Sequence, residues 1–202
     1  TPDIIVIACN TASTTALEDI RKEVKIPVVG VVPAIKPAAK LTRTGTIGVL
    51  GTPGTVRREY VENLMADHAS HCRIIRQGSV GLVALAEKQL SGETIAILDI
   101  RAEIADLFSN HGGKEIDTVV LACTHFPLLK DELQAASPHP VNWIDSGAAI
   151  AKRVKSILGN KALENGFPQD KEIAFLIGPN PPLERKKAFG AYGFNRVIGL
   201  MA

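Results

Sequence analysis

The chain has 202 residues, of which 46% are hydrophobic and 22% are charged, and this composition excludes disorder, collagen-like repeats and coiled coils. The longest apolar run, Ile4 to Cys9, has six residues, too few to cross a membrane. A net charge of +2 and an aromatic content of 4% offer neither an electrostatic nor a stacking surface for nucleic acid. We therefore predict a soluble α/β protein whose partner is a small molecule.

Apolar, β-branched runs alternate with helical patterns along the chain. Strands are predicted at residues 4–8, 27–32, 47–50, 118–122, 141–144, 173–177 and 197–200. Helices are predicted at residues 11–24, 56–65, 82–90, 94–110, 146–158 and 182–189, with one more opening at Pro127. This alternation is typical of parallel sheets with helices on both faces.

Two proline-containing segments, 32–45 and 137–140, are candidate crossovers between domains. If both are boundaries, residues 36–140 form one α/β lobe. Residues 1–35 and 141–202 then pair to form the other lobe.

The three cysteines, Cys9, Cys72 and Cys123, are widely spaced and contain no CxxC pair. An odd and dispersed set predicts a reducing compartment, with neither a disulfide framework nor a structural zinc site. Free thiols usually pack as small buried hydrophobes, and we interpret Cys72 in this way.

An internal repeat distinguishes the other two cysteines. Residues 3–11, with the sequence DIIVIACNT, align without gaps on residues 117–125, with the sequence DTVVLACTH. Each copy predicts a buried strand that ends in Ala-Cys and is followed by a helix, so both thiols fall at the sheet edge where ligands bind. A helix N-terminus favours a thiolate, and the neighbouring polar groups and amides suit a bound carboxylate.

Two thiols that face one cleft from opposite sides can invert a carbon that bears an acidic hydrogen. One thiolate removes the proton from one face, and the opposite thiol returns a proton to the other face. A thiol with a pKa of ~8.5 suits both tasks after a modest shift of that pKa. The alternative is that Cys9 and Cys123 are two core cysteines that happen to repeat.

Three motifs resemble those of the glutamate racemase family, within the aspartate/glutamate racemase superfamily: ACNTAS at 8–13, GTPGT at 51–55 and ACTHFPLL at 122–129. The resemblance includes WIDSG at 143–147 and covers nearly the whole chain. It implies two pseudo-symmetric lobes with the active site in the cleft between them, and interconversion of L- and D-glutamate without pyridoxal phosphate, metal or nucleotide. It also implies a cytoplasmic homodimer that supplies D-glutamate for peptidoglycan, and hence for cell wall biogenesis and cell shape.

The same resemblance implies roles for individual residues. Cys9 would deprotonate D-glutamate and Cys123 would deprotonate L-glutamate, with His125 tuning Cys123 or assisting its proton transfer; a helix cap is the alternative for His125. Glu87 falls where the family often has an acidic residue, and a solvated helix charge is the alternative. The residues implied to hold substrate are Asn10, Thr11, Thr52, Thr55, Thr124 and His125.

The sequence also departs from the family. Nothing before Thr1 corresponds to the family's opening Asp-Ser-Gly strand, and that role is not transferred to Asp145-Ser146-Gly147. We therefore expect that the family's first strand–helix units are absent and that this chain alone is inactive.

The basic clusters at 57–58 and 185–187 are interpreted as solvated helix surfaces. The alternative functions are an aspartate or hydantoin racemase of the same superfamily, and a non-catalytic ligand-binding module.

Overall fold

The computed structural model describes residues 2–159 and 172–201, and its largest sheet has four parallel strands in the order β4-β3-β5-β6. Strands β3 and β5 lie in the middle of this sheet and are buried along their whole length. The predicted α/β class with parallel sheets flanked by helices is confirmed. The strands are β3 (Thr46–Gly51), β4 (Arg73–Gly78), β5 (Thr118–Ala122) and β6 (Asn142–Ile144).

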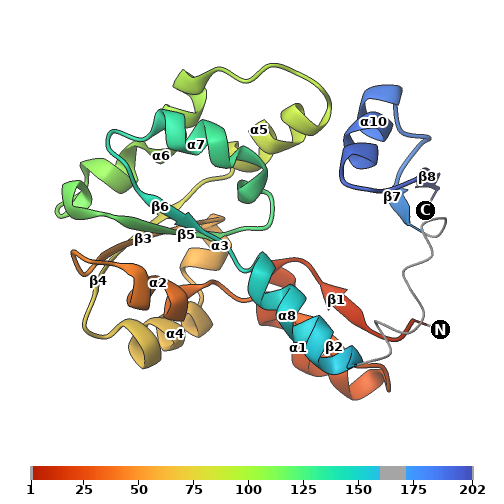
Figure 1. The fold of residues 1–202 in the computed structure, drawn as a ribbon, viewed down its shortest axis with the longest axis horizontal. Helices are drawn as coiled ribbons and strands as arrows, with labels where there is room; N and C mark the ends of the chain where they lie inside the picture. The colour runs from red at the N-terminus through yellow and green to blue at the C-terminus, as the bar shows by residue number, and fades with distance from the viewer. Residues whose placement is uncertain (1, 160–171, 202) are drawn as a thin grey trace.

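Helices cover both faces of the sheet, because its inner strands present apolar side chains on both sides. Val119 and Leu121 of β5 pack into one core cluster, and Val120 and Ala122 pack into the other. In Figure 1, α5, α6 and α7 lie above the sheet and α2 and α4 lie below it. The bounds are α2 (Ile35–Leu41), α3 (Pro53–Val56), α4 (Glu59–Ala69), α5 (Gly81–Leu90), α6 (Ile97–Ser109) and α7 (Lys130–Ala136), with 3₁₀ turns η1 (Gly113–Glu115) and η2 (Phe126–Leu129).

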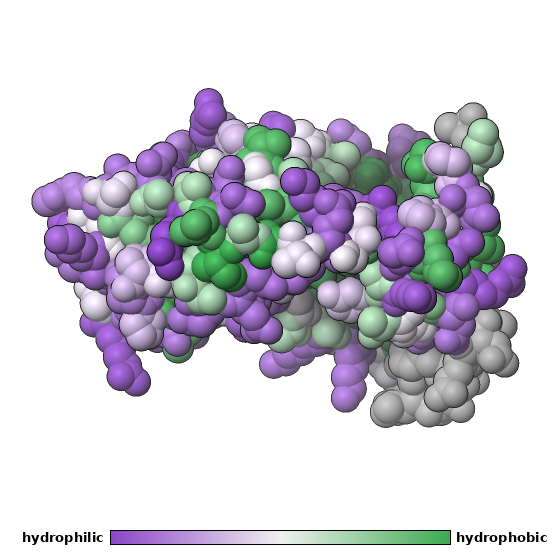
Figure 2. Space-filling view, turned by 90° about the horizontal axis from the view of Figure 1, so that it is seen from above, coloured by the Kyte–Doolittle hydropathy of each residue, from purple (hydrophilic) through white to green (hydrophobic). Residues whose placement is uncertain are grey.

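Two smaller units complete the described part of the chain (Figure 1). In the first, β1 pairs with β2 and α8 packs against β2; in the second, β7 pairs with β8. Figure 2 shows a mostly hydrophilic surface with scattered apolar residues, some of which gather at its right-hand end over the second unit. The bounds are β1 (Ile5–Ile7), α1 (Asn10–Glu23), β2 (Val28–Gly30), α8 (Gly147–Leu158), β7 (Ile173–Ile177), α10 (Leu183–Ala191) and β8 (Arg196–Leu200).

One α-helix and one strand were not predicted. Helix α2 lies within the segment 32–45, where prolines indicated a crossover, but Pro37 falls in the first turn of the helix, whose N–H groups have no partner inside the helix. Strand β4 carries Arg73 and Arg76, which exposes charge along an edge strand and hides the strand pattern. The predicted helix over 56–65 is divided into α3 and α4 at Arg57 and Arg58.

The position of β6 also differs from the predicted lobe boundary. Residues 142–144 were assigned to the first lobe, but β6 pairs with β5 from Thr118↔Asn142 to Val120↔Ile144. Parallel pairing with a central strand therefore keeps the chain in the larger sheet beyond the prolines of 137–140. The part of this prediction that concerns residues 160–171 lies outside the described residues.

Candidate active site

The two repeated cysteines follow equivalent strands. Cys9 comes two residues after β1 and caps α1, where its Sγ accepts a hydrogen bond from the N–H of Ala12 at 3.4 Å. Cys123 comes directly after β5 and before η2. Both thiols therefore lie at the carboxyl ends of parallel strands, as the repeat predicts.

A hydrogen bond joins the two copies of the repeat. The hydroxyl of Thr124 donates to the carbonyl oxygen of Ala8 at 3.0 Å, so the residue after one thiol contacts the residue before the other. A charge on Cys9 is also close enough to raise the pKa of Cys123. The structure thus brings Cys9 and Cys123 together from positions 114 residues apart in the sequence, the offset of the repeat.

The two thiols have different surroundings. Cys9 is exposed, whereas Cys123 is 9% exposed and belongs to the larger core cluster. Burial raises the pKa of Cys123, a charge on Cys9 raises it further, and the N–H groups of His125 and Phe126 partly offset this by donating hydrogen bonds. A thiolate at Cys9 therefore favours the neutral thiol at Cys123.

Three of the threonines predicted to hold substrate form a connected row. The hydroxyl of Thr55 lies 3.0 Å from the hydroxyl of Thr52 and 3.0 Å from the hydroxyl of Thr11. Thr52 and Thr55 belong to the loop after β3 and to α3, whereas Thr11 belongs to α1. The row connects the two predicted lobes on the side of Cys9, and Thr55 at its centre is 1% exposed.

His125 and Glu87 are in direct contact. Nε2 of His125 lies 3.0 Å from Oε1 of Glu87, and a carboxylate can only accept, so the hydrogen of this bond is on Nε2. His125 occupies the N-cap position of η2, but its side chain makes no capping hydrogen bond there and contacts Glu87 instead. Oε2 of Glu87 accepts a hydrogen bond from Nη2 of Arg185, so Glu87 is not a freely solvated helix charge.

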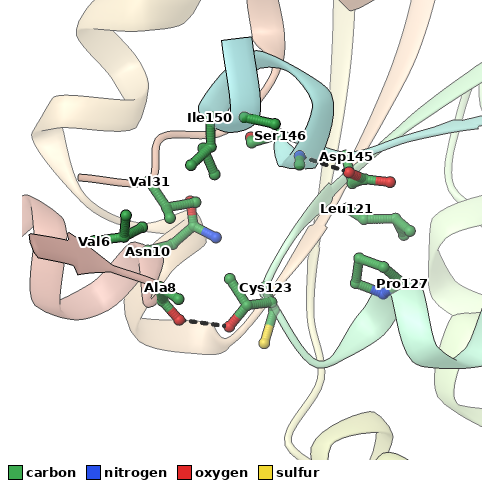
Figure 3. Close-up of a pocket in the computed structure, with 13 residues that line it drawn as sticks. Val6, Ala8, Asn10, Val31, Leu121, Cys123, Pro127, Asp145, Ser146 and Ile150 are labelled. Atoms are coloured by element: carbon green, nitrogen blue, oxygen red, sulfur yellow. Dashed lines mark hydrogen bonds between the residues drawn. The ribbon is translucent and has the colours of Figure 1, made fainter. Parts of the chain in front are cut away.

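A cavity of about 380 Å³ opens beside Cys123, between β1, β2, β5 and the start of α8 (Figure 3). Asn10, Cys123 and Thr124 line it, and the other predicted site residues lie outside its lining. Asn10 is 4% exposed, and its Oδ1 has no hydrogen-bond partner within the described residues, which leaves an acceptor available for a ligand.

Sequence reasoning missed several residues near these groups. Asp145, Ser146 and Gly147 were set aside because they follow a late strand, yet they line the cavity beside Cys123, and Oδ1 of Asp145 accepts from the N–H of Gly147 at 2.7 Å. Their resemblance to the Asp-Ser-Gly letters was the signal that could have found them. Arg185 was assigned to a solvated cluster, and that interpretation is wrong because its side chain pairs with Glu87.

Within residues 2–159 and 172–201, no three histidine, cysteine, aspartate or glutamate side chains are placed to hold a metal ion. In the same residues, every helix is too short or too polar to span a lipid bilayer.

The sequence profile of the Asp/Glu/Hydantoin racemase family matches residues 1–154, and the chain belongs to this family. The chain is 44% identical over 193 residues to the glutamate racemase of Brucella ovis, an alignment that covers 95% of this chain and 70% of that one. It is 47% identical over 179 residues to the glutamate racemase of Pectobacterium carotovorum, covering 88% of this chain and 61% of that one.

Solved structures agree with this assignment. The structure of Escherichia coli glutamate racemase in complex with L-glutamate and the activator UDP-MurNAc-ala is 41% identical and superposes with a TM-score of 0.86, covering 98% of this chain and 74% of that one. The glutamate racemase isoform RacE1 of Bacillus anthracis, at 24% identity and a TM-score of 0.77 over 99% of this chain and 73% of that one, shows the fold alone. The enzymes that this chain resembles are therefore amino-acid racemases.

Proposed function

We propose that the protein interconverts L-glutamate and D-glutamate, with Cys9 and Cys123 as the two acid–base groups. The observation that supports the proposal is the hydrogen bond from Thr124 to the carbonyl of Ala8, which joins the residue after one thiol to the residue before the other. The glutamate racemases that resemble the chain at 41–47% identity support glutamate as the substrate.

The reaction requires two proton transfers. The thiolate of one cysteine takes the α-proton, so the Cα–H bond breaks, an S–H bond forms and the electron pair stays on the substrate as a planar carbanion. The thiol of the other cysteine then breaks its S–H bond and gives its proton to the opposite face. Each turnover exchanges the protonation states of Cys9 and Cys123. The charge on Cys9 that raises the pKa of Cys123 supports this scheme, because it disfavours two simultaneous thiolates.

We assign removal of the α-proton from D-glutamate to Cys9 and from L-glutamate to Cys123. In this scheme His125, held by Glu87, assists proton transfer at Cys123. The substrate carboxylates bind to the amide and hydroxyl groups near the two thiols, which are supplied by Asn10, Thr11, Thr52, Thr55, Thr124 and His125.

The wider role follows from the product. D-glutamate made in the cytoplasm is a precursor of peptidoglycan, so we propose a role in cell wall biogenesis and the maintenance of cell shape. We also propose that the protein acts as a homodimer. The site is proposed to lie between two lobes, with the boundary after β6 rather than after residue 140, because β6 completes the larger sheet.

The test is exchange with solvent deuterium. In D₂O, a complete version of the protein should incorporate deuterium at Cα of glutamate from either enantiomer, measured by proton NMR, while optical rotation follows racemisation. Replacing Cys9 or Cys123 by serine should lower kcat by about 10²- to 10⁴-fold, because each removes one of the two acid–base groups. Cys72→Ser is the matched control and should retain the parent rate.

Aspartate and hydantoins are assayed in parallel. A faster exchange with either of them would replace glutamate as the substrate, and binding without exchange would indicate a non-catalytic module. If the double variant Cys9→Ser, Cys123→Ser still racemises glutamate at the parent rate, the two-thiol mechanism is wrong.

A further inference from the structure

The carboxylate of Glu87 is shared between two partners from different parts of the chain. Its Oε1 lies 3.0 Å from Nε2 of His125, and its Oε2 accepts from Nη2 of Arg185. Glu87 belongs to α5, His125 precedes η2, and Arg185 belongs to α10. The C-terminal unit therefore contacts the group that holds the histidine next to Cys123.

Helix α10 is placed so that Arg185 can hold this position. It packs against α5, beside which it lies in Figure 1. The packing between the two helices is incomplete, because a cavity of about 410 Å³ is lined by Gln89 of α5 and by Ala188 and Ala191 of α10. Nε of Arg185 is buried without a hydrogen-bond partner within the described residues, so the guanidinium is turned inward toward Glu87 rather than outward to water.

We propose that Arg185 is a positioning residue, which fixes the carboxylate of Glu87 and through it the ring of His125. The effect of Arg185 on the catalytic rate rests on the proposed function, whereas its effect on the position of the His125 ring does not. A carboxylate with a single hydrogen-bonded partner can rotate about its side-chain torsions, whereas a second partner on the other oxygen fixes both its position and its plane. The guanidinium also balances the negative charge of Glu87.

The contribution of this contact is to geometry more than to stability. The side chains of Arg185 and Glu87 are 31% and 40% exposed, and ion pairs at such positions contribute little to the free energy of unfolding. Small displacements of an acid–base group nevertheless lower rates strongly. Lys187 is the matched control on the same helix, since it is exposed and its ammonium makes no ion pair within the described residues.

The experiment observes the ring of His125 directly. The protein is prepared with ¹⁵N-labelled histidine, and the signals of His125 are assigned by their loss in His125→Gln, while the other four histidines serve as internal references. In Arg185→Leu, the ring signals of His125 should shift or broaden and those of the other histidines should not. Lys187→Leu should leave all signals unchanged. If Arg185→Leu does not fold, Arg185→Gln should give the same change in the His125 signals. In Arg185→Lys, the His125 signals should lie nearer to those of the parent protein than in Arg185→Gln.

A second set of spectra tests whether Arg185 acts through Glu87. In a Glu87→Leu background, Arg185→Leu should cause no further change at His125, because leucine accepts no hydrogen bond and the connection is already broken. Unchanged His125 signals in Arg185→Leu would overturn the proposal, as would an undiminished effect of Arg185→Leu in the Glu87→Leu background.

Kinetics then separate this proposal from the proposed function. Arg185→Leu should lower kcat for racemisation about tenfold and leave KM within about twofold, since the group is displaced from the reacting atoms and not from the substrate carboxylates. Ring spectra need no substrate, so they decide the role of Arg185 even if the parent protein does not racemise glutamate. Unchanged kcat together with displaced ring signals would overturn the catalytic consequence of the proposal.

Discussion

The two copies of the repeat, residues 3–11 and 117–125, share a sequence pattern but differ in their surroundings. Strand β5 lies between two neighbours in the four-stranded sheet and is buried throughout. Strand β1 belongs to a two-stranded sheet, and its central residue Val6 is 40% exposed. Within the described residues, the same pattern forms a core strand in one place and a partly exposed strand in the other.

This difference separates what a motif determines from what its neighbours determine. In both copies, the motif ends a parallel strand with a cysteine near a helical turn. The number of packing partners then determines burial, and burial determines the acid–base behaviour of the thiol. Cys9 and Cys123 are equivalent in the alignment but unequal in burial, and burial raises the pKa of Cys123.

The largest effect is expected on the free energy of unfolding, when the aligned valines Val6 and Val120 are each replaced. Val120→Ala should lower the free energy of unfolding by about 2 kcal/mol, because Val120 is 0% exposed and its loss leaves a cavity between two packed faces. Val6→Ala makes the same chemical change at the aligned position, 40% exposed, and should cost about 0.5 kcal/mol or less. Urea titrations followed by circular dichroism and by the fluorescence of Trp143, which pairs with Val119, measure both. Equal losses would contradict the contrast between the two strands.

The next effect is the rate of alkylation by iodoacetamide, which reacts with the thiolate. At pH 7.5 Cys9 should react at least about tenfold faster than Cys123, because Cys9 is exposed while burial both shields Cys123 and raises its pKa. Peptide mapping by mass spectrometry follows each cysteine separately. Similar rates would show that the aligned thiols are equivalent after all.

Cys9→Ala sharpens this measurement. Burial is the larger cause of the raised pKa of Cys123 and remains in the variant, but the contribution of the charge on Cys9 is lost. The pH at which alkylation of Cys123 reaches half its maximal rate should therefore fall in Cys9→Ala. Thr15→Ala, a change at an exposed residue of the same helix, is the control and should leave that pH unchanged.

The smallest expected effect compares the aspartates that begin the two copies. Asp117 accepts hydrogen bonds from the hydroxyl of Thr42 and from the N–H groups of Arg43 and Thr44, whereas Asp3 is exposed and has no side-chain hydrogen bond within the described residues. Asp117→Ala should lower the free energy of unfolding by about 1 kcal/mol and Asp3→Ala should leave it nearly unchanged.

The effect of Asp117→Ala should also depend on pH. Burial alone would raise the pKa of Asp117, but the hydrogen bonds to its carboxylate outweigh burial and hold the pKa below its ordinary value. A lowered folded-state pKa means that the stabilisation is present above the unfolded-state value, about 3.9, and is lost as pH falls through the folded-state value. Urea titrations at pH 7 and in acid should show the difference between parent and variant shrinking in acid. A difference that grows in acid would contradict this assignment.

Much of the fold could be predicted because the apolar runs are strong. The runs that become β1 and β5 and the helical stripe of α1 have a clear period, and their observed bounds lie within one or two residues of those predicted. The two cysteines could be found because the repeat copies a strand end. Helix α2 and strand β4 were missed because prolines and edge charges concealed their patterns.

The remaining features depend on contacts between distant residues. The pairing of β6 with β5 contradicts the boundary that the prolines indicated, since strand pairing is not encoded by local composition. Glu87 and Arg185 are 98 residues apart, and neither neighbourhood in the sequence shows that they meet. Position in the sequence therefore predicted which residues carry reactive groups, but not which residues hold them in place.

The row of hydroxyls formed by Thr52, Thr55 and Thr11 has a consequence for a ligand with two mirror-image forms. Each hydroxyl carries one hydrogen, so the row can orient its O–H bonds from Thr52 to Thr11 or in the opposite sense. Reversal exchanges the two ends, so that the end that donates becomes the end that accepts and the other end changes the opposite way, without moving a heavy atom. Under the proposed racemisation, one rigid set of side chains can thus offer complementary hydrogen bonds to both enantiomers.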